Sequence, residues 1–218
     1  MLAAIVAGAI SAAAAIGINL DGQDGFGPRP VAKRPTLALL TSLPLVFGES
    51  FGLQSGGSPA LTRLEQRYNI LPIGVADRAS LDGQRLLLMA HPRAQPAEAL
   101  VELDQWVRGG GRVLLLADPR LDWPSERPLG DKLRPPPDFA DTGLLGHWGL
   151  VLSGSESTAG QLENRGSCDI AADGLIARCR IGRGRATVIA DADFLNVKAS
   201  DAAALNPLVA ELDHLESR

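Results

Sequence analysis

The sequence predicts an α/β domain with a mainly parallel β-sheet flanked by helices, and three observations support this prediction. The segment Arg85–Pro119 has the pattern of a complete strand–helix–strand unit. The expected strands are short continuous apolar runs, which is typical of strands that are buried on both faces. The 218 residues, 45% of them hydrophobic, suit one domain with an ordinary core. Two parallel strands joined by a helix almost always form a right-handed crossover, so this unit defines the fold class.

Each part of the unit has a local signal. Leu86–Ala90 is the first strand, and His91-Pro92 ends it because proline cannot donate to a ladder. Pro96 suits the first turn of the helix, where its missing N–H has no consequence. Gly109–Gly111 stops the helix, and Val113–Ala117 is the second strand.

Upstream, Thr36–Thr41 is expected to be a strand, and Leu43–Gly57 a long loop. Ser58 and Pro59 are a good cap and first residue for a helix, and Ile70–Val75 is the next expected strand.

Downstream, Arg120–Asp138 contains five prolines and is expected to be an irregular excursion over the surface. A short helix is expected at Thr142–Trp148 and a short strand at Leu150–Leu152. A further strand is expected at Ala186–Ala190, and Asn206 caps a final helix.

An antiparallel hairpin near the C-terminus carries both cysteines. Ser167–Ala172 and Leu175–Ile181 flank Asp173-Gly174, a preferred two-residue turn. This register places Cys168 directly opposite Cys179, at a Cα separation of about 4.5–5.5 Å that a disulfide can bridge. A disulfide would imply an oxidising compartment, whereas two buried thiols would have the same sequence pattern, so both interpretations stand.

The N-terminal segment differs from the rest of the chain. Leu2–Leu20 is uncharged and just long enough to cross a bilayer, which favours a hydrophobic helix that anchors the chain in a membrane. A cleaved signal segment, a buried helix or a wrongly assigned start are the alternatives. Asp21–Pro35 is rich in glycine and proline and is expected to be a linker, so the division is 1–20, 21–35 and 36–218.

Charge and composition argue against nucleic acid as a partner. The chain has 21 Lys and Arg against 25 Asp and Glu, and only 4% of its residues are aromatic. The cluster Arg178, Arg180, Arg183 and Arg185 is interpreted as a solvated face of the hairpin and its turn. Contact with anionic lipid or with a partner is the alternative.

Polar residues at strand ends are the candidate site. Ser42, His91 and Asp118 each follow an expected parallel strand, and such ends meet at one edge of the sheet. They could mimic a catalytic triad, but convergence at that edge is expected by chance, and no G-x-S-x-G motif is present. No catalytic residue is therefore predicted.

A metal or a nucleotide is not expected either. Asp191 and Asp193 could join His91 and Asp118 in an oxygen-rich site, but aspartates after strands usually cap the following turns. The histidines match no zinc spacing, and the glycine-rich loop lacks phosphate-binding motifs and carries Glu49. We predict no metal and no cofactor.

An ordered series of segments resembles a known family. The segments are SLPLVFGE, LLLMAHPRAQPAEALVELDQWVRGGGRVLLLADP, LLGHWGLVL, GRGRATVIADADFL and LNPLVAELDHL. Together they resemble the auxiliary domain of gliding-motility-type (GldG-like) ABC transport systems over roughly Thr36 to Leu215. The resemblance implies a flavodoxin-like or class I glutamine-amidotransferase-like fold.

The resemblance also implies a function without catalysis. We expect a membrane-anchored accessory domain, periplasmic at a bacterial inner membrane, that works beside ABC permease and ATPase subunits. The expected binding residues are those at the carboxyl edge of the sheet: Ser42, Glu49, His91, Asp118, Arg120, Asp191 and Asp193. Two alternatives remain, a hydrolase- or amidotransferase-like enzyme and a periplasmic sensor of small molecules or glycans. In the sensor, the Leu43–Gly57 and Arg120–Asp138 loops would border a cleft.

Overall fold

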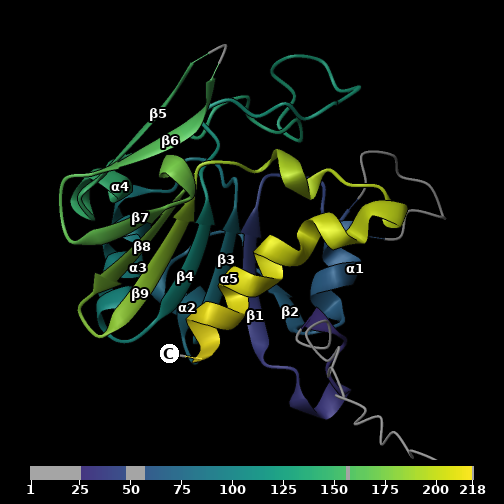
Figure 1. The fold of residues 1–218 in the computed structure, drawn as a ribbon, viewed down its shortest axis with the longest axis horizontal. Coiled ribbons are helices and arrows are strands. Elements are labelled where there is room, and N and C mark those ends of the chain that lie inside the picture. The colour runs from purple at the N-terminus through teal and green to yellow at the C-terminus, as the bar shows by residue number, and fades with distance from the viewer. Residues whose placement is uncertain (1–25, 48–56, 156–157, 218) are drawn as a thin grey trace, which may run out of the picture.

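The computed structural model describes residues 26–47, 57–155 and 158–217 (Figure 1). The strands are β1 (Thr36–Thr41), β2 (Asn69–Pro72), β3 (Leu86–Ala90), β4 (Arg112–Leu116), β5 (Leu150–Ser155), β6 (Thr158–Asn164), β7 (Cys168–Ala171), β8 (Ile176–Ile181) and β9 (Gly184–Ile189). The α-helices are α1 (Pro59–Glu65), α2 (Arg78–Leu81), α3 (Ala97–Arg108), α4 (Leu144–His147) and α5 (Asn206–Ser217).

Seven of these strands form one sheet in the order β2-β1-β3-β4-β9-β8-β7. The five strands from β2 to β9 are parallel, whereas β8 and β7 extend the sheet by antiparallel pairing. A separate antiparallel pair, β5 and β6, lies beyond the carboxyl end of the parallel strands (Figure 1). The predicted α/β class with a mainly parallel sheet and an antiparallel hairpin is confirmed.

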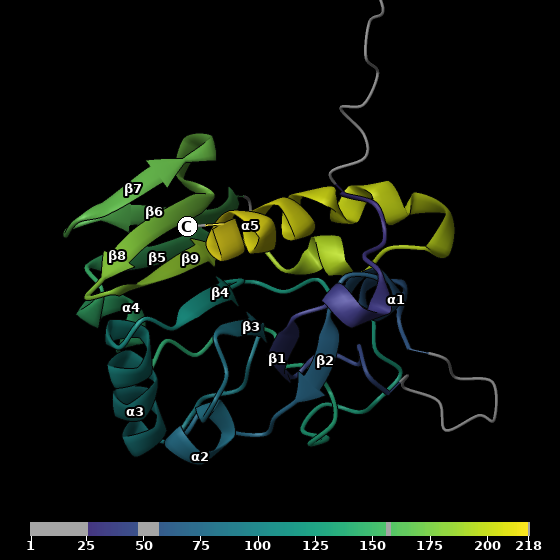
Figure 2. The same ribbon diagram turned by 90° about the horizontal axis from the view of Figure 1, so that it is seen from below.

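Helices cover both faces of the sheet. Figure 2 shows α1 and α5 on one face and α2, α3 and α4 on the other. Leu103 and Val107 of α3 pack into the core on one side, and Leu208 and Leu212 of α5 pack into the core on the other. Because the two cores share the sheet, its central strands are buried on both faces, as their continuous apolar sequences predict.

The predicted helix boundaries follow from caps. The Ser58 hydroxyl accepts a hydrogen bond from the Leu61 amide at 3.1 Å, with Pro59 as the first helical residue. Pro96 is the residue immediately before α3 rather than within its first turn. Beyond the end of α3, Gly110 has φ +119°, a conformation that glycine adopts without strain.

The cysteine hairpin has the predicted register and a longer turn. Cys168 lies opposite Cys179 with a Cα separation of 4.2 Å, and the two sulfur atoms are bonded. The last pair is Ala171 with Ile176, so four residues rather than two connect the strands. The predicted two-residue turn was wrong. The observed turn is longer by one residue on each side, so the residues of the two strands still pair as predicted.

Two elements had no clear signal in the sequence. Helix α2 is a single turn capped by Asp77, whose side chain accepts a hydrogen bond from the Ser80 amide at 2.8 Å. Strand β6 has few strand-favouring residues and is held by its pairing with β5. Strand β2 is shorter than expected because it ends at Pro72, which has no N–H to donate.

The structure contradicts the predicted transmembrane helix and, with it, the predicted membrane-anchored periplasmic location. No helix among residues 26–47, 57–155 and 158–217 is both long and apolar enough to cross a bilayer. Helices α3 and α5 have 12 residues each, whereas a span needs about 20. The segment Leu2–Leu20, on which the expectation depended, lies outside the described residues.

The described end of the expected linker lies against the domain. The Arg29 side chain pairs with Asp213 at 2.8 Å and with Glu216 at 2.9 Å, both on α5. The Arg67 side chain, 5% exposed, donates two hydrogen bonds to Asp213 and one to the Gly27 carbonyl. These contacts hold the chain that leads into β1 against α1 and α5.

Candidate functional site

The carboxyl ends of β1 and β3 are where a site is expected in this topology. The chain leaves β1 toward β2 on one side and leaves β3 toward β4 on the other, so the strand order reverses between them. In open α/β sheets, ligands bind at such a switch point. Ser42 follows β1 and His91 follows β3, so the sequence placed both residues at the correct position.

The side chains at this point bind the two loops to each other. The Thr41 hydroxyl donates to the Ala90 carbonyl at 2.8 Å, and the Ser42 hydroxyl donates to the backbone carbonyl of His91. The Ser42 hydroxyl therefore points at a carbonyl oxygen and not at the His91 imidazole. A serine in this arrangement has no base to accept its proton.

His91 is a buried structural residue with an unusual backbone. Its φ is 45° and its side chain is fully buried, with the ring 6.4 Å from the Phe139 ring in an edge contact. The Nε2 atom lies 3.0 Å from the Pro136 carbonyl, which assigns the proton to Nε2. Within the described residues, Nδ1 has no partner. Burial lowers the pKa of His91, so the ring is neutral at pH 7.

Asp118 connects three loops through its carboxylate and its carbonyl. One carboxylate oxygen accepts from the Arg120 amide at 2.8 Å, and the other accepts from the Ala192 amide at 2.9 Å. Its own backbone carbonyl accepts from the Phe139 amide at 2.8 Å. Asp118 is 5% exposed, and within the described residues neither of its carboxylate oxygens is hydrogen-bonded to the His91 imidazole, so Ser42, His91 and Asp118 do not form a triad.

Asp191 and Asp193 complete an acidic cluster with Asp118. Ligand atoms of the three carboxylates lie within 4.8 Å of one another. Asp191 accepts from the Asp193 amide, and Asp193 accepts from the Asp122 amide, each at 2.8 Å. These are the capping contacts expected of aspartates after strands. Burial, followed by the nearby negative charges, raises the pKa of Asp193 to about 6, and burial also raises the pKa of Asp191.

A cavity of about 460 Å³ opens beside the switch point. We call it the switch-point cavity, and its lining residues are Leu39, Thr41, Ser42, Leu43, Pro44, Val46, Phe47, Pro72, Ile73, Arg93, Arg127, Lys132 and Leu133. Most of them are apolar, three are cationic, and none of these described lining residues is acidic. Glu49, which the sequence also suggested, lies outside the described residues.

The proline-rich loop forms one wall of this cavity. The Arg93 guanidinium donates to the Lys132 carbonyl at 2.6 Å and to the Arg134 carbonyl at 2.5 Å, which holds the loop near the end of β3. Sequence reasoning found Ser42 but missed Arg93 and Lys132. Their approach depends on how the irregular loop folds back, for which the sequence has no periodic signal.

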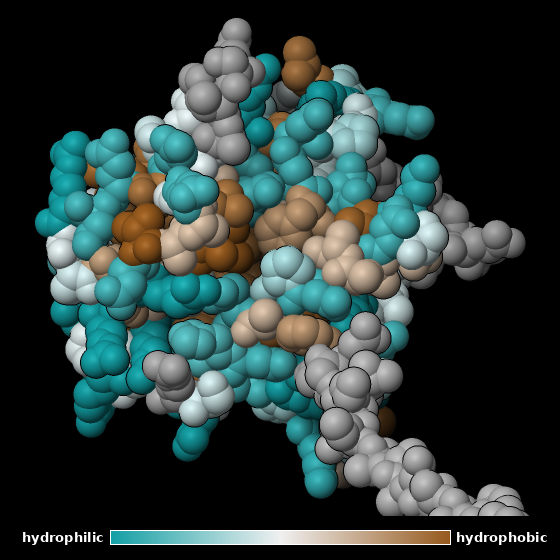
Figure 3. All heavy atoms as spheres, in the orientation of Figure 1, coloured by the Kyte–Doolittle hydropathy of each residue, from teal (hydrophilic) through white to brown (hydrophobic). Residues whose placement is uncertain are grey.

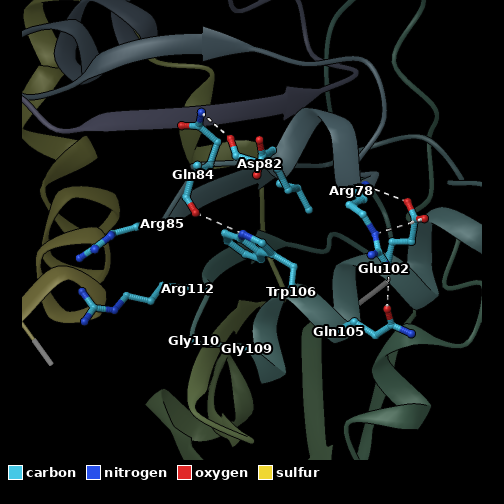
Figure 4. A pocket seen from close by; sticks show the side chains of 13 residues that line it. Arg78, Asp82, Gln84, Arg85, Glu102, Gln105, Trp106, Gly109, Gly110 and Arg112 are labelled. Carbon is cyan, nitrogen blue, oxygen red and sulfur yellow. Dashed lines mark hydrogen bonds and ion pairs between the residues drawn. The ribbon is translucent and has the colours of Figure 1, made fainter.

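A second cavity, of about 580 Å³, lies at the opposite edge of the sheet (Figure 4). It is bordered by the segments that lead into β3 and β4. The Trp106 indole donates to the Gln84 carbonyl at 3.2 Å, and Glu102 accepts from the Arg78 amide at 2.8 Å. Figure 4 shows the Arg85 and Arg112 side chains side by side, extending in the same direction.

Comparisons with known proteins show the fold and no family. No protein-family model matches the chain, and no curated protein matches it. Among solved structures, the N-terminal domain of mmIFT52 is similar with a TM-score of 0.52 at 13% identity, over 81% of this chain and 96% of that domain. At this identity the likeness shows a shared arrangement of strands and helices.

Glycosidases are also similar in part. The exo-β-1,4-mannosidase Op5Man5 from Opitutaceae bacterium strain TAV5 has a TM-score of 0.42 at 15% identity, over 84% of this chain and 36% of the enzyme. The GH42 β-galactosidase Gan42B from G. stearothermophilus, as its E323A mutant, has a TM-score of 0.43 at 13% identity, over 86% of this chain and 31% of the enzyme. The chain thus spans about a third of their length, and such TM-scores carry no argument about activity.

These findings correct the description of the chain as a GldG-like, transmembrane component of an ABC transporter. Neither family models nor curated proteins support that description, and the described part of the chain has no membrane-spanning helix. What the structure establishes is a mixed α/β domain with a mainly parallel sheet.

Proposed function

We propose that this chain is a non-catalytic binding domain whose switch-point cavity accepts an apolar ligand group that carries an anion. The observation that supports the proposal is the composition of the cavity wall, which is apolar at its floor and cationic at its rim. A volume of about 460 Å³ lies within the usual range for small-ligand sites.

The fold supports this placement. The strand order β2-β1-β3-β4-β9 is the order of flavodoxin-like sheets, and we propose that the domain belongs to that class of folds. In this class the ligand lies outside the carboxyl ends of the first and third strands, which is where the switch-point cavity opens. The antiparallel strands β8 and β7 are an extension beyond that arrangement.

The chemistry of the rim favours an anion. Arg93 and Lys132 are exposed, whereas Leu39 and Leu43 at the floor are buried. An anion between two cations beside an apolar wall is attracted more strongly than in water, because the wall lowers the local dielectric constant. A neutral polar ligand would gain less, and a cation would be repelled.

The hydrogen bonds at the strand ends disfavour the enzyme alternative. The Ser42 hydroxyl donates to a backbone carbonyl, and both carboxylate oxygens of Asp118 accept hydrogen bonds from backbone amides. We expect hydrolysis of p-nitrophenyl acetate at the rate of buffer alone, and the same rate for Ser42→Ala. A serine-dependent burst would contradict the non-catalytic proposal.

The binding test uses 8-anilinonaphthalene-1-sulfonate, an aromatic ring system with one sulfonate. We expect saturable binding at one site, followed by fluorescence, and displacement by decanoate but not by decyltrimethylammonium. Lys132→Glu should weaken binding at least fivefold because it places a negative charge at the rim. Val46→Trp should also weaken it because the indole would fill the cavity.

Lys198→Glu is the matched control. Lys198 is exposed, lies just before the 3-10 segment Ala199–Leu205 and is not among the cavity residues, and the substitution changes the net charge equally. Equal binding by Lys132→Glu, Lys198→Glu and the wild type would show that the dye binds elsewhere and would refute the proposal.

The partner class stays a prediction. An accessory role beside ABC permease and ATPase subunits depends only on the resemblance of the sequence to GldG-like auxiliary domains. We do not propose a membrane-anchored form of that role. Co-purification with such subunits would support it, and the cavity proposal does not depend on the result.

A further inference from the structure

A row of arginines crosses three strands on one face of the sheet. Arg112 of β4 lies directly opposite Arg185 of β9, and Arg185 lies directly opposite Arg180 of β8. We call these three residues the arginine ladder. Adjacent strands are about 4.8 Å apart, so the ladder is about 10 Å long.

The ladder lies on the face that carries α5. Val113 and Ala186, the neighbours of Arg112 and Arg185 along their strands, point into the core beneath α3, so the arginines point to the other face. The Arg112 side chain donates to the Glu216 carbonyl of α5 at 2.6 Å, which agrees with this assignment. Figure 4 shows the Arg85 side chain beside that of Arg112, so Arg85 extends the positive charge toward the second cavity.

Among the described residues, no helix covers this face of the sheet beyond β9. Helix α5 packs on β4 and β9, and β8 and β7 extend past it (Figures 1 and 2). Figure 3, in the orientation of Figure 1, shows hydrophilic side chains gathered at the lower left, where β8 turns into β9. Arg85 and Arg180 are exposed, whereas Arg112 and Arg185 are half-buried.

The acidic side chains of α5 form ion pairs with arginines outside the ladder. Glu211 binds the Arg178 guanidinium, with the Nε atom at 2.9 Å, and Glu216 binds Arg29. Within the described residues, the side chains of Arg85 and Arg180 form no hydrogen bond and no ion pair. The surplus is local, because the whole chain has a formal net charge of −4.

A bound anion near Arg85 and Arg180 would offset part of the repulsion within this row. Like charges directly opposite on neighbouring strands are destabilising. The carbonyl oxygens at the end of α5 offset part of this repulsion at Arg112, because a helix C-terminus carries partial negative charge. They do not reach Arg180, which lies two strands away from Arg112.

We propose that the arginine ladder, with Arg85, is a docking surface for an acidic, extended segment of a partner protein. Guanidinium groups bind carboxylates through paired hydrogen bonds, and a row about 10 Å long matches two or three carboxylates on such a segment. Strands β7, β8 and β9 contain no aromatic residue on which bases could stack, so a peptide suits this surface better than a single-stranded nucleic acid. This surface is separate from the switch-point cavity.

The test uses a fluorescein-labelled decamer of glutamate and fluorescence anisotropy at low salt. We expect saturable binding that weakens as salt is added, and no binding of a glutamine decamer. The Arg85→Glu/Arg180→Glu double variant should weaken binding at least tenfold and keep the melting temperature of the wild type. Arg180→Lys should retain part of the affinity, because the charge remains while the paired geometry is lost.

Arg165→Glu is the control for the loss of one positive charge. Arg165 is 70% exposed, beyond the end of β6, and lies 4.0 Å from Glu163. The Arg165→Glu variant should bind the glutamate decamer as the wild type does. The Lys132→Glu variant, whose substitution is in the switch-point cavity, should do the same. The proposal is overturned by equal weakening in Arg165→Glu or by no binding at all. It is also overturned if an oligonucleotide of equal charge binds more tightly through the same arginines.

Discussion

At the carboxyl edge of the parallel strands, His91 and Asp118 are buried and their hydrogen bonds hold loops together. At the amino edge, Arg85 and Arg180 are exposed and form no ion pair within the described residues. The carboxyl edge is the one where this fold usually places its site. Here its conspicuous polar residues are structural, and the apolar switch-point cavity beside them is the better candidate.

The difference shows how to separate structural from functional polar groups in this domain. Asp118 uses both carboxylate oxygens to accept backbone N–H groups, so its removal should affect stability. The side chains of Arg85 and Arg180 have no partner within the described residues, so their removal should affect binding rather than stability. Four substitutions, in order of the expected effect on stability, test this contrast.

The largest effect is expected for His91→Ala. It removes a buried ring and the donor to the Pro136 carbonyl, and it leaves alanine at a φ of 45°. We expect a loss of about 4 kcal/mol in the free energy of unfolding at pH 8, measured by urea denaturation.

The stability lost in His91→Ala should depend on pH. Because burial lowers the pKa of His91 from its ordinary 6.5, the wild type loses stability as the pH falls below about 6.5 and the unfolded chain takes up the proton. The penalty of His91→Ala should therefore be smaller at pH 5 than at pH 8. His91→Asn should be milder than His91→Ala, since asparagine tolerates positive φ. Equal penalties for the two variants would argue against backbone strain at this position.

Asp118→Ala is expected to cost about 3 kcal/mol, because the Arg120 and Ala192 amides lose their acceptor and the Ala192 amide is buried. Urea denaturation measures the loss. Asp122→Ala is the control, because Asp122 is an exposed aspartate in the same region. Similar losses in the two variants would contradict the capping role of Asp118.

Asp193→Asn should stabilise the protein at neutral pH. The folded pKa of about 6 lies above the ordinary 3.8, so this carboxyl lowers stability progressively as the pH rises from about 4 to 6. Because Asp193 is only half-buried, solvent screens its charge, and we expect a gain of only about 1 kcal/mol at pH 7.5. Thermal melting at pH 7.5 and pH 4.5 measures it, and a gain that is equal at both pH values would exclude the carboxylate charge as the cause.

The smallest effect is expected for Arg180→Ala. Removal of one member of a like-charged row should change the free energy of unfolding by no more than about 0.5 kcal/mol. Chemical denaturation at low salt gives the comparison with the wild type. A loss above about 1.5 kcal/mol would mean that Arg180 is bound within the fold and would weaken the contrast between the two edges.

Much of the fold was predictable because its signals are local. Strands β1, β3 and β4 are continuous apolar runs, and Ser58, Pro59 and Gly109–Gly111 mark helix ends. The pairing of Cys168 with Cys179 followed from hairpin register, which depends on only eleven residues of separation. Strand β6 was missed because a polar strand held only by its neighbour has no hydrophobic period.

The candidate sites were predictable only in outline. Strand ends placed Ser42, His91 and Asp118 at one edge, but the directions of their side chains depend on loops that approach from elsewhere in the chain. The arginine cluster of the hairpin was visible in the sequence. Its continuation through Arg112 was not, because Arg112 lies 73 positions before Arg185 and meets it only through the sheet register.

The sequence by itself determined the order of most strands and helices, since apolar runs, caps and turn residues act over a few positions. Tertiary structure decided which polar groups are internally satisfied and which remain available. The residue type alone does not tell whether a carboxyl or guanidinium group is buried or paired, because burial and hydrogen-bond partners are set by segments far apart in the chain. That is why the buried Asp118 is structural in this protein, while the arginine ladder is the surface we expect a partner to contact.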